Sequence, residues 1–425
     1  MRDAHGLLRL LLTLSATGCV AGAVLVMGCA GAGPGVGIDA GTTVDAGGPR
    51  DDARLLPRDA SLPCEGPVRL SSVVPGAWPD VWERSDVVAT ADRTGIALAW
   101  REHATSGDLG TPRVGRIRMP SSAPEIEPFP EVVPLRFVDG FLPDASGRTW
   151  AAYTDAGDRS GIVEVADTGL GPVHWFAVPP EAGRFTLARY CEGSNLASIF
   201  TCSAEGRYGL ALLRVGPDGP PVLSELAPLD GWGTCDLAGL QPAVPFCAAH
   251  DGLVSVIALP PGAAAQAVLV EWSGDTLALR RGPALLEQVR GGDAAGRAAG
   301  VLDGSDIVLF ETRTYEADLR AFRIASGIAT LLGTVPLDLP AGGMGASVLG
   351  AARLPSGAFV AVLRTAELLS LVSLDGVRLG LPTIVANIAC NSSARVISVG
   401  GGLFLPLSCY APRSIRLLEL CRGSV

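Results

Sequence analysis

Residues Ala351-Ala-Arg-Leu-Pro-Ser-Gly-Ala-Phe-Val-Ala-Val-Leu-Arg364 contain two short apolar runs separated by a Pro-Ser-Gly turn. After a polar loop, a third apolar run, Leu368-Leu-Ser-Leu-Val-Ser-Leu374, ends at Asp375-Gly376. Short apolar runs bounded by Gly, Pro and Asp are typical of β-strands joined by tight turns. This stretch therefore predicts three consecutive strands.

Degenerate copies of the same unit fill most of the chain. The apolar second run of the unit aligns seven times, at residues 96–100, 149–153, 196–200, 243–246, 307–310, 359–363 and 403–407. Equivalent positions in these runs are separated by 54, 46, 47, 64, 52 and 44 residues. A period near 50 residues without a helical pattern is typical of the four-stranded blades of a β-propeller.

Two of the turns carry a resemblance to known proteins. Pro143-Asp-Ala-Ser-Gly147 and Ala91-Asp-Arg-Thr-Gly95 resemble the Asp-x-x-Gly blade turns of bacterial periplasmic propellers, and the pattern extends over residues 66–421. A pair of two-sheet sandwiches would also give short strands at regular spacing. Because seven copies align, we expect an all-β, seven-bladed β-propeller over residues 64–425. The widest interval predicts a long outer hairpin or an insertion at residues 268–279.

The last copy predicts how the ring closes. Its three strands are expected near residues 394–399, 403–407 and 414–420, which leaves no residues for a fourth strand before Val425. An unpaired blade edge would expose a row of backbone hydrogen-bonding groups, and propellers fill such an edge with a strand from the other terminus. We expect residues 68–74 to complete the last blade, antiparallel to its third strand.

The N-terminus predicts export and lipidation. Arg2 and Arg9 precede an apolar stretch at residues 10–27, which is typical of a secretory signal, although its length also permits a transmembrane helix. The stretch ends in Leu25-Val-Met-Gly-Cys29, which resembles a bacterial lipobox, and Ala16-Thr-Gly-Cys19 is a weaker second match. This resemblance implies a lipoprotein signal peptide at residues 1–28 and acylation of Cys29.

The following segment, residues 29–63, contains many glycines and two copies of Asp-Ala-Gly, which predicts a disordered tether. Ala30 follows the cysteine. Lipoproteins of this kind that are held at the inner membrane carry Asp at that position. We therefore expect a protein of the cell envelope, anchored by lipid in the outer membrane.

Composition excludes several functions. All 33 basic residues are arginine, which excludes Schiff-base and P-loop lysine chemistry. A net charge of −10 without a basic run argues against nucleic-acid partners. His103, His174 and His250 lie in separate copies without ligand spacing, and no nucleophile elbow, Cys-x-x-Cys or calcium loop occurs. We expect no metal, cofactor or catalytic set.

Binding residues are expected on the loops between second and third strands, the usual binding face of a propeller. These loops carry the charged and aromatic residues Arg101, His103, Asp155, Asp158, Arg159, Glu205, His250, Asp251, Arg313, Tyr315, Arg364, Glu367 and Arg413. Their mixed charge favours a non-enzymatic binding or assembly scaffold with a protein or peptide partner. The alternative is a propeller hydrolase or lyase acting on extracellular or envelope polymers. It requires carboxylates such as Asp155, Asp158, Glu205 or Asp251 to converge.

Eight cysteines remain after Cys19 and Cys29. An even number in an exported chain predicts four disulfides, although 105 pairings are possible. The blade register favours Cys235–Cys247 and Cys390–Cys409, and elimination leaves Cys191–Cys202. Closure of the ring by residues 68–74 favours Cys64–Cys421.

The lipidation hypothesis makes a direct prediction. Replacing the acylated residue, Cys29→Ala, should release a soluble or unprocessed form from the membrane fraction. Cell fractionation and mass spectrometry of the N-terminal peptide measure this outcome. An unmodified wild-type protein cleaved at another position would contradict it.

Overall fold

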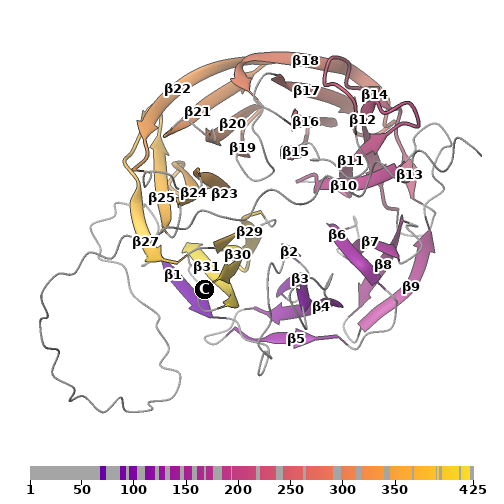
Figure 1. Ribbon diagram of the computed structural model, residues 1–425, viewed down its shortest axis with the longest axis horizontal. Helices are drawn as coiled ribbons and strands as arrows, with labels where there is room; N and C mark the ends of the chain where they lie inside the picture. The colour runs from indigo at the N-terminus through magenta and orange to yellow at the C-terminus, as the bar shows by residue number, and fades with distance from the viewer. Residues whose placement is uncertain are drawn as a thin grey trace, which may run out of the picture. The chain divides into compact units, whose positions relative to one another are not determined.

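Seven separate antiparallel sheets contain all the strands of the computed structural model, and they are arranged as a ring (Figure 1). The sheets belong to one unit, Asp51–Val425. The structure describes residues 68–72, 87–91, 95–102, 111–119, 124–129, 135–143, 148–155, 160–166, 169–175, 184–192, 194–216, 221–235, 243–261, 265–290, 298–312, 317–338, 345–365, 368–388, 390–391, 395–410 and 413–421. The predicted leader, Cys29 and the predicted tether lie outside these residues.

Each sheet is one blade, numbered here in chain order. Blade 1 contains β2 (Val88–Ala91), β3 (Gly95–Glu102), β4 (Thr111–Arg118) and β5 (Ile126–Pro128). Blade 2 contains β6 (Leu135–Pro143), β7 (Thr149–Asp155), β8 (Ser160–Ala166) and β9 (Gly169–Trp175). Blade 3 contains β10 (Arg184–Tyr190), β11 (Leu196–Cys202), β12 (Tyr208–Arg214), β13 (Val222–Leu223) and β14 (Ala227–Pro228).

The next three blades follow the same order. Blade 4 contains β15 (Ala243–His250), β16 (Leu253–Leu259), β17 (Gln266–Ser273) and β18 (Leu279–Arg290). Blade 5 contains β19 (Ala298–Asp303), β20 (Asp306–Thr312), β21 (Asp318–Ala325) and β22 (Ile328–Pro336). Blade 6 contains β23 (Ser347–Arg353), β24 (Phe359–Thr365), β25 (Leu368–Asp375), β26 (Arg378–Leu379) and β27 (Thr383–Asn387).

Blade 7 closes the ring as the sequence predicts. It contains β28 (Cys390–Asn391), β29 (Ile397–Val399), β30 (Gly402–Tyr410), β31 (Arg413–Cys421) and, at its outer edge, β1 (Arg69–Ser72). The N-terminal strand β1 runs antiparallel to β31, with Arg69 opposite Glu419. The expected all-β, seven-bladed propeller closed by an N-terminal strand is confirmed.

Seven apolar clusters form the core, one at each junction between neighbouring blades. The middle strands of a blade are therefore covered on both faces. Residues Leu196 to Thr201 of β11 are all buried, for example, and so are Phe359 to Leu363 of β24. Burial on both faces explains why these strands are continuous apolar runs instead of alternating ones.

Blade 4 corrects the predicted register. The run at residues 243–246 is the start of a first strand, β15, and Leu253–Leu259 is the second strand instead of the third. Residues 268–279 are part of β17, its turn and the first residue of β18, so they form the predicted long outer hairpin instead of an insertion. The turn between β15 and β16 has Asp251 at φ 49° and Gly252 at φ 71°, the conformation of an Asp-Gly hairpin. Because all inner strands are similarly apolar, hydrophobicity alone assigned the wrong one.

The structure describes three disulfides, of which one matches the prediction and two do not. Cys390–Cys409 is confirmed. The predicted Cys191–Cys202 and Cys235–Cys247 pairs are wrong, because the structure joins Cys191 to Cys247 and Cys202 to Cys235. Cys247 lies in the first strand of blade 4. Cys191 directly follows the first strand of blade 3, which lies beside it. Cys191–Cys247 therefore joins two blades, whereas Cys202–Cys235 joins two segments of blade 3.

The fourth predicted bridge is not tested, since Cys64 lies outside the described residues. Cys421 is buried at the end of β31 and forms no disulfide with any cysteine that the structure describes. The three bridges are typical of an oxidising compartment outside the cytoplasm. Within the described part of the chain, no helix is long and apolar enough to cross a membrane.

The closing strand makes a stability prediction. Leu70 of β1 is buried in the cluster that also contains Leu405 and Leu418 of blade 7 and Val360 of blade 6. The substitution Leu70→Ala should therefore lower the free energy of unfolding by about 2–3 kcal/mol, because it leaves a cavity at the closing junction. Denaturant unfolding measures the change, with the neighbouring half-buried Ser71→Ala as the matched control. Equal, small effects of the two substitutions would show that β1 does not close the ring.

Candidate functional site

The ring has two chemically different ends. An isolated parallel bridge between Glu192 and Ala248 shows that the first strands of blades 3 and 4 run in the same direction. The turns from first to second strands, which we call the turn end, therefore lie together. The loops from second to third strands, which we call the loop end, lie at the opposite end of the strands.

The predicted binding residues are divided between these ends. Arg101 and Arg364 lie near the ends of β3 and β24, Asp155 ends β7 and Arg413 begins β31, so these four lie at the loop end with Glu205. His103, Asp158, Arg159, Arg313, Tyr315 and Glu367 lie outside the described residues, as do the side chains of Asp155 and Arg413.

His250 and Asp251 do not belong to the loop end. They form the turn between the first and second strands of blade 4, and the His250 Nε2 to Asp251 Oδ2 distance is 3.0 Å. Both side chains are exposed to solvent. Their predicted position is wrong for the same reason as the register of blade 4.

Of the four carboxylates named for the hydrolase alternative, the structure describes the side chains of Glu205 and Asp251 only. Glu205 lies at the loop end, where it contacts Arg207 at 3.4 Å, whereas Asp251 lies at the turn end. These two carboxylates therefore cannot flank one glycosidic bond. The buried carboxylate of Glu311 in blade 5 contacts Arg320 at 3.1 Å, so a charged partner compensates its burial.

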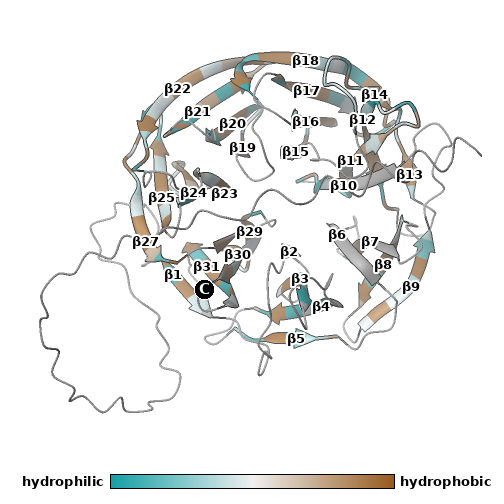
Figure 2. Ribbon diagram, in the orientation of Figure 1, coloured by the Kyte–Doolittle hydropathy of each residue, from teal (hydrophilic) through white to brown (hydrophobic). Residues whose placement is uncertain are grey.

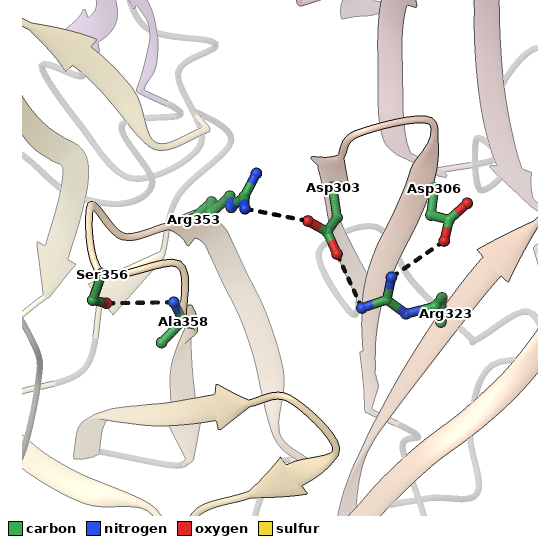
Figure 3. Close-up of polar contacts among 6 residues, drawn as sticks. All are labelled: Asp303, Asp306, Arg323, Arg353, Ser356 and Ala358. Carbon is green, nitrogen blue, oxygen red and sulfur yellow. Dashed lines mark hydrogen bonds and ion pairs between the residues drawn. The ribbon is translucent and has the colours of Figure 1, made fainter.

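A polar network links blades 5 and 6 at the turn end (Figure 3). Arg323 contacts Asp303 at 2.9 Å and Asp306 at 3.2 Å, across the hairpin turn between β19 and β20. Arg353 of blade 6 approaches the same Asp303 at 3.5 Å. These four charges balance, and they hold one turn and two blades together.

Other arginines connect neighbouring blades at this end in the same way. Arg214 of blade 3 donates to the backbone carbonyls of Gly274 and Asp275 in a turn of blade 4. Arg281 of blade 4 donates to the Ser326 carbonyl in a turn of blade 5, at 3.5 Å. Arginine suits this task because its planar guanidinium carries five donors. Many turn-end charges are thus structural.

The centre of the ring contains a different cluster, formed by Arg189, Tyr190, Glu192 and Arg395. The first three lie at the end of β10 in blade 3, and Arg395 precedes β29 in blade 7, on another side of the ring (Figure 1). Arg395 Nη1 is 3.3 Å from Glu192 Oε1, and the Arg395 guanidinium carbon is 4.1 Å from the centre of the Tyr190 ring. The cluster therefore joins two blades that are not neighbours.

Burial shifts the pKa of two members of this cluster. Burial lowers the pKa of Arg189 to about 10, opposed by the negative charge of Glu192 and assisted by the positive charge of Arg395. Burial also raises the pKa of Tyr190 above its ordinary value, although Arg395 and the hydrogen bond to Ser194 oppose this shift. Sequence patterns missed this cluster. Its only signal is the charged pair Arg189 and Glu192 flanking Tyr190-Cys191 at the end of a strand.

The outer edge of the ring exposes large aliphatic side chains. They lie on the outer strands and turns of three consecutive blades, at Leu285, Ile328, Leu331, Val377, Leu381 and Ile384. We call this set the apolar rim. The outer strands β18, β22 and β26 contact one another in this order, so the rim continues across the three blades. Figure 2 shows hydrophobic segments along β18 and β22 at this edge.

The described residues form no metal centre. Nowhere in those ranges do three His, Cys, Asp or Glu side chains gather closely enough to hold a metal ion.

Comparison with known proteins identifies no family. No protein-family model and no curated protein matches the sequence. Among solved structures, the chain is similar to the β-propeller domain of Cps50 (Swd1) from Myceliophteria thermophila, with 9% identity, coverage of 80% of this chain and 98% of that chain, and a TM-score of 0.44.

Two further solved structures are similar to a comparable degree. The SapL1 lectin in complex with alpha methyl fucoside has 9% identity, covers 72% of this chain and 97% of its own, and gives a TM-score of 0.43. A puromycin-hydrolyzing peptidase from Mycobacterium tuberculosis has 13% identity, covers 83% of this chain and 57% of its own, and also gives 0.43. Likenesses this distant carry no argument about function. The class of the protein, a seven-bladed β-propeller, rests on its own strand pairing.

The Tyr190 hydroxyl makes a pH-dependent prediction. Its pKa is higher in the folded than in the unfolded chain, so the unfolded chain loses this proton first as the pH rises through about 10. The contribution of Tyr190 to stability is therefore present below pH 10 and lost above it. Tyr190→Phe should lower stability at pH 8 by about 1 kcal/mol, since the hydrogen bond to the Ser194 carbonyl disappears, but it should reduce the further loss between pH 8 and pH 11. Unfolding curves at the two pH values measure this difference, and an identical decline in both proteins would contradict it.

Proposed function

We propose that this protein is a lipoprotein of the cell envelope whose propeller serves as a non-enzymatic binding or assembly scaffold. The apolar rim is the observation that carries the proposal. Single exposed apolar residues are normal on protein surfaces, whereas a continuous patch marks an interaction site. Val377 and Leu381 are 74% and 76% exposed, and Ile328 is 69% exposed, so these side chains contribute little to the core of the ring.

The edge of blade 5 supports a protein or peptide partner. Its outer strand β22 has the sequence Ile328-Ala-Thr-Leu-Leu-Gly-Thr-Val-Pro336, without one charged residue. Edge strands are normally protected from pairing by charges, bulges or short length. The neighbouring β18 has such protection in Arg280, Arg281 and Pro283. We therefore propose that an extended segment of the partner pairs with β22 and covers the rim, as in β-strand addition.

Export and anchoring complete the proposal. The three disulfides support an oxidising location, and the lipobox-like sequence at Cys29 supports attachment to the outer membrane. Two or more acyl chains suffice for stable anchoring. An anchored ring with an uncharged edge would hold its partner close to the membrane.

Site-specific photo-crosslinking in intact cells tests this function. A photoreactive residue at Leu331, in the centre of the rim, should capture one defined protein. The same residue at Arg207, which is exposed at the loop end, serves as the matched control. A second variant, Leu331→Asp, should abolish capture by a photoreactive residue at Leu381 while leaving thermal stability nearly unchanged, because Leu331 is 45% exposed.

Two results would contradict the scaffold. Equal labelling at Leu331 and Arg207 would show that the rim has no specific partner. Turnover of an envelope polymer by the purified protein would favour the hydrolase or lyase instead.

A further inference from the structure

We infer that a small carboxylate ligand binds at the turn end of the ring, between Arg189 of blade 3 and Arg395 of blade 7. This site is separate from the apolar rim in its position and its chemistry. It rests on the placement of four side chains, their contacts and their balance of charge.

The cluster has more positive than negative charge. Arg189 and Arg395 carry two guanidinium groups, and of the described residues in the cluster only Glu192 carries a carboxylate. Arg189 stays charged at neutral pH, since a pKa of about 10 leaves it protonated. A buried positive charge is costly unless an anion or hydrogen-bond acceptors compensate it. A ligand carboxylate would supply the missing negative charge.

The arginines also have donors left for such a ligand. Arg189 donates one hydrogen bond to the Val244 carbonyl, at 3.2 Å. Arg395 approaches Glu192 through one nitrogen at 3.3 Å, which is longer than the 2.7–2.9 Å typical of strong guanidinium–carboxylate pairs. Arg395 also lies over the Tyr190 ring and forms a hydrogen bond with the Tyr190 side chain, but its buried Nη1 has no hydrogen-bond partner among the described residues. A carboxylate is the group that matches the edge of a guanidinium.

The strand that carries the site is held rigidly. The Tyr190 hydroxyl donates to the Ser194 carbonyl at 2.5 Å. Cys191, which lies between Tyr190 and Glu192 in sequence, is joined to Cys247 by a disulfide. Glu192 exchanges two backbone hydrogen bonds with blade 4: its N–H donates to the Cys247 carbonyl, and its carbonyl accepts from Ala249. Such support lowers the ordering cost of binding.

We infer the class of ligand from the carboxylate that the cluster already contains. Glu192 places a carboxylate beside Arg395, so the side chains are arranged for this group. Glu192 is also 41% exposed, whereas Arg395 is 16% exposed, so solvent reaches the carboxylate side of the pair. An incoming carboxylate would compete with Glu192 for Arg395 or bind beside it at Arg189.

Calorimetric titration of the full chain with sodium succinate, at constant ionic strength in chloride, tests the inference. Wild-type protein should bind succinate, and Arg395→Gln and Arg189→Gln should each weaken binding at least about tenfold. Arg207→Gln, an exposed arginine at the loop end, should leave binding unchanged.

Glu192→Gln distinguishes a ligand site from a purely structural contact. If the site binds carboxylates, removing the competing carboxylate should tighten succinate binding by about tenfold. If the cluster only connects blades, Glu192→Gln should lower thermal stability and succinate should bind neither protein. This variant also decides the matter if an arginine variant fails to fold.

Parallel titrations with sodium phosphate test the ligand class. Phosphate binding as tight as succinate binding would overturn the assignment to carboxylates. Succinate binding that survives both arginine substitutions would overturn the location. Absence of succinate binding to wild-type protein and to Glu192→Gln would overturn the site itself. None of these results bears on capture of a partner at the apolar rim.

Discussion

The pairing of β1 with β31 is the constraint on which the ring depends. Every blade covers its neighbour through one apolar cluster, so each blade needs a partner on both sides. At the closing junction, Val68 and Leu70 belong to the same cluster as residues of blades 6 and 7. Without β1, the outer edge of β31 would be unpaired and this cluster would lose part of its cover. The first described residues of the chain thus complete its last blade.

The sequence was sufficient to predict the architecture because the repeat reflects a physical constraint, the burial of each blade's inner strands. Each unit buries second and third strands on both faces, and the resulting apolar runs recur with a period near 50 residues. The closing strand could be predicted because the last unit lacks a fourth strand. The strands of blade 4 are hard to assign from sequence because β15, β16 and β17 are almost equally apolar. The Asp251-Gly252 turn joins the first and second strands, whereas the sequence pattern predicts a loop between second and third strands at this point.

The cysteine pairing and the central cluster were harder to predict for a common reason. Cys191 lies beside Cys247 only because the first strands of blades 3 and 4 are parallel neighbours. Arg395 reaches Glu192 only because the ring brings blade 7 near blade 3. Patterns within one repeat describe hairpins well, but they contain no information on contacts between repeats. The apolar rim has the same origin, since single exposed aliphatic residues become a surface only when neighbouring outer strands adjoin.

Much of the described charge in this ring serves to hold its parts together. At the turn end, arginines such as Arg323 and Arg214 are occupied in holding turns and blades together. The buried Glu311 is compensated by Arg320, and Glu205 and Asp251 lie at opposite ends. Our two proposals rest on an uncharged outer edge at blade 5 and on the positively charged cluster of Arg189 and Arg395. Both need a rigid closed ring to stay in place.

Native-state hydrogen exchange of the backbone amides of β1 and β31 tests closure of the ring most directly. If β1 completes blade 7, the protected amides of Leu70 and its neighbours should exchange with the same opening free energy as those of β31, and both should follow the global unfolding of the protein. Exchange of the β1 amides at a much lower opening free energy, with β31 still protected, would contradict the account. It would show that the ring is stable with its last blade open.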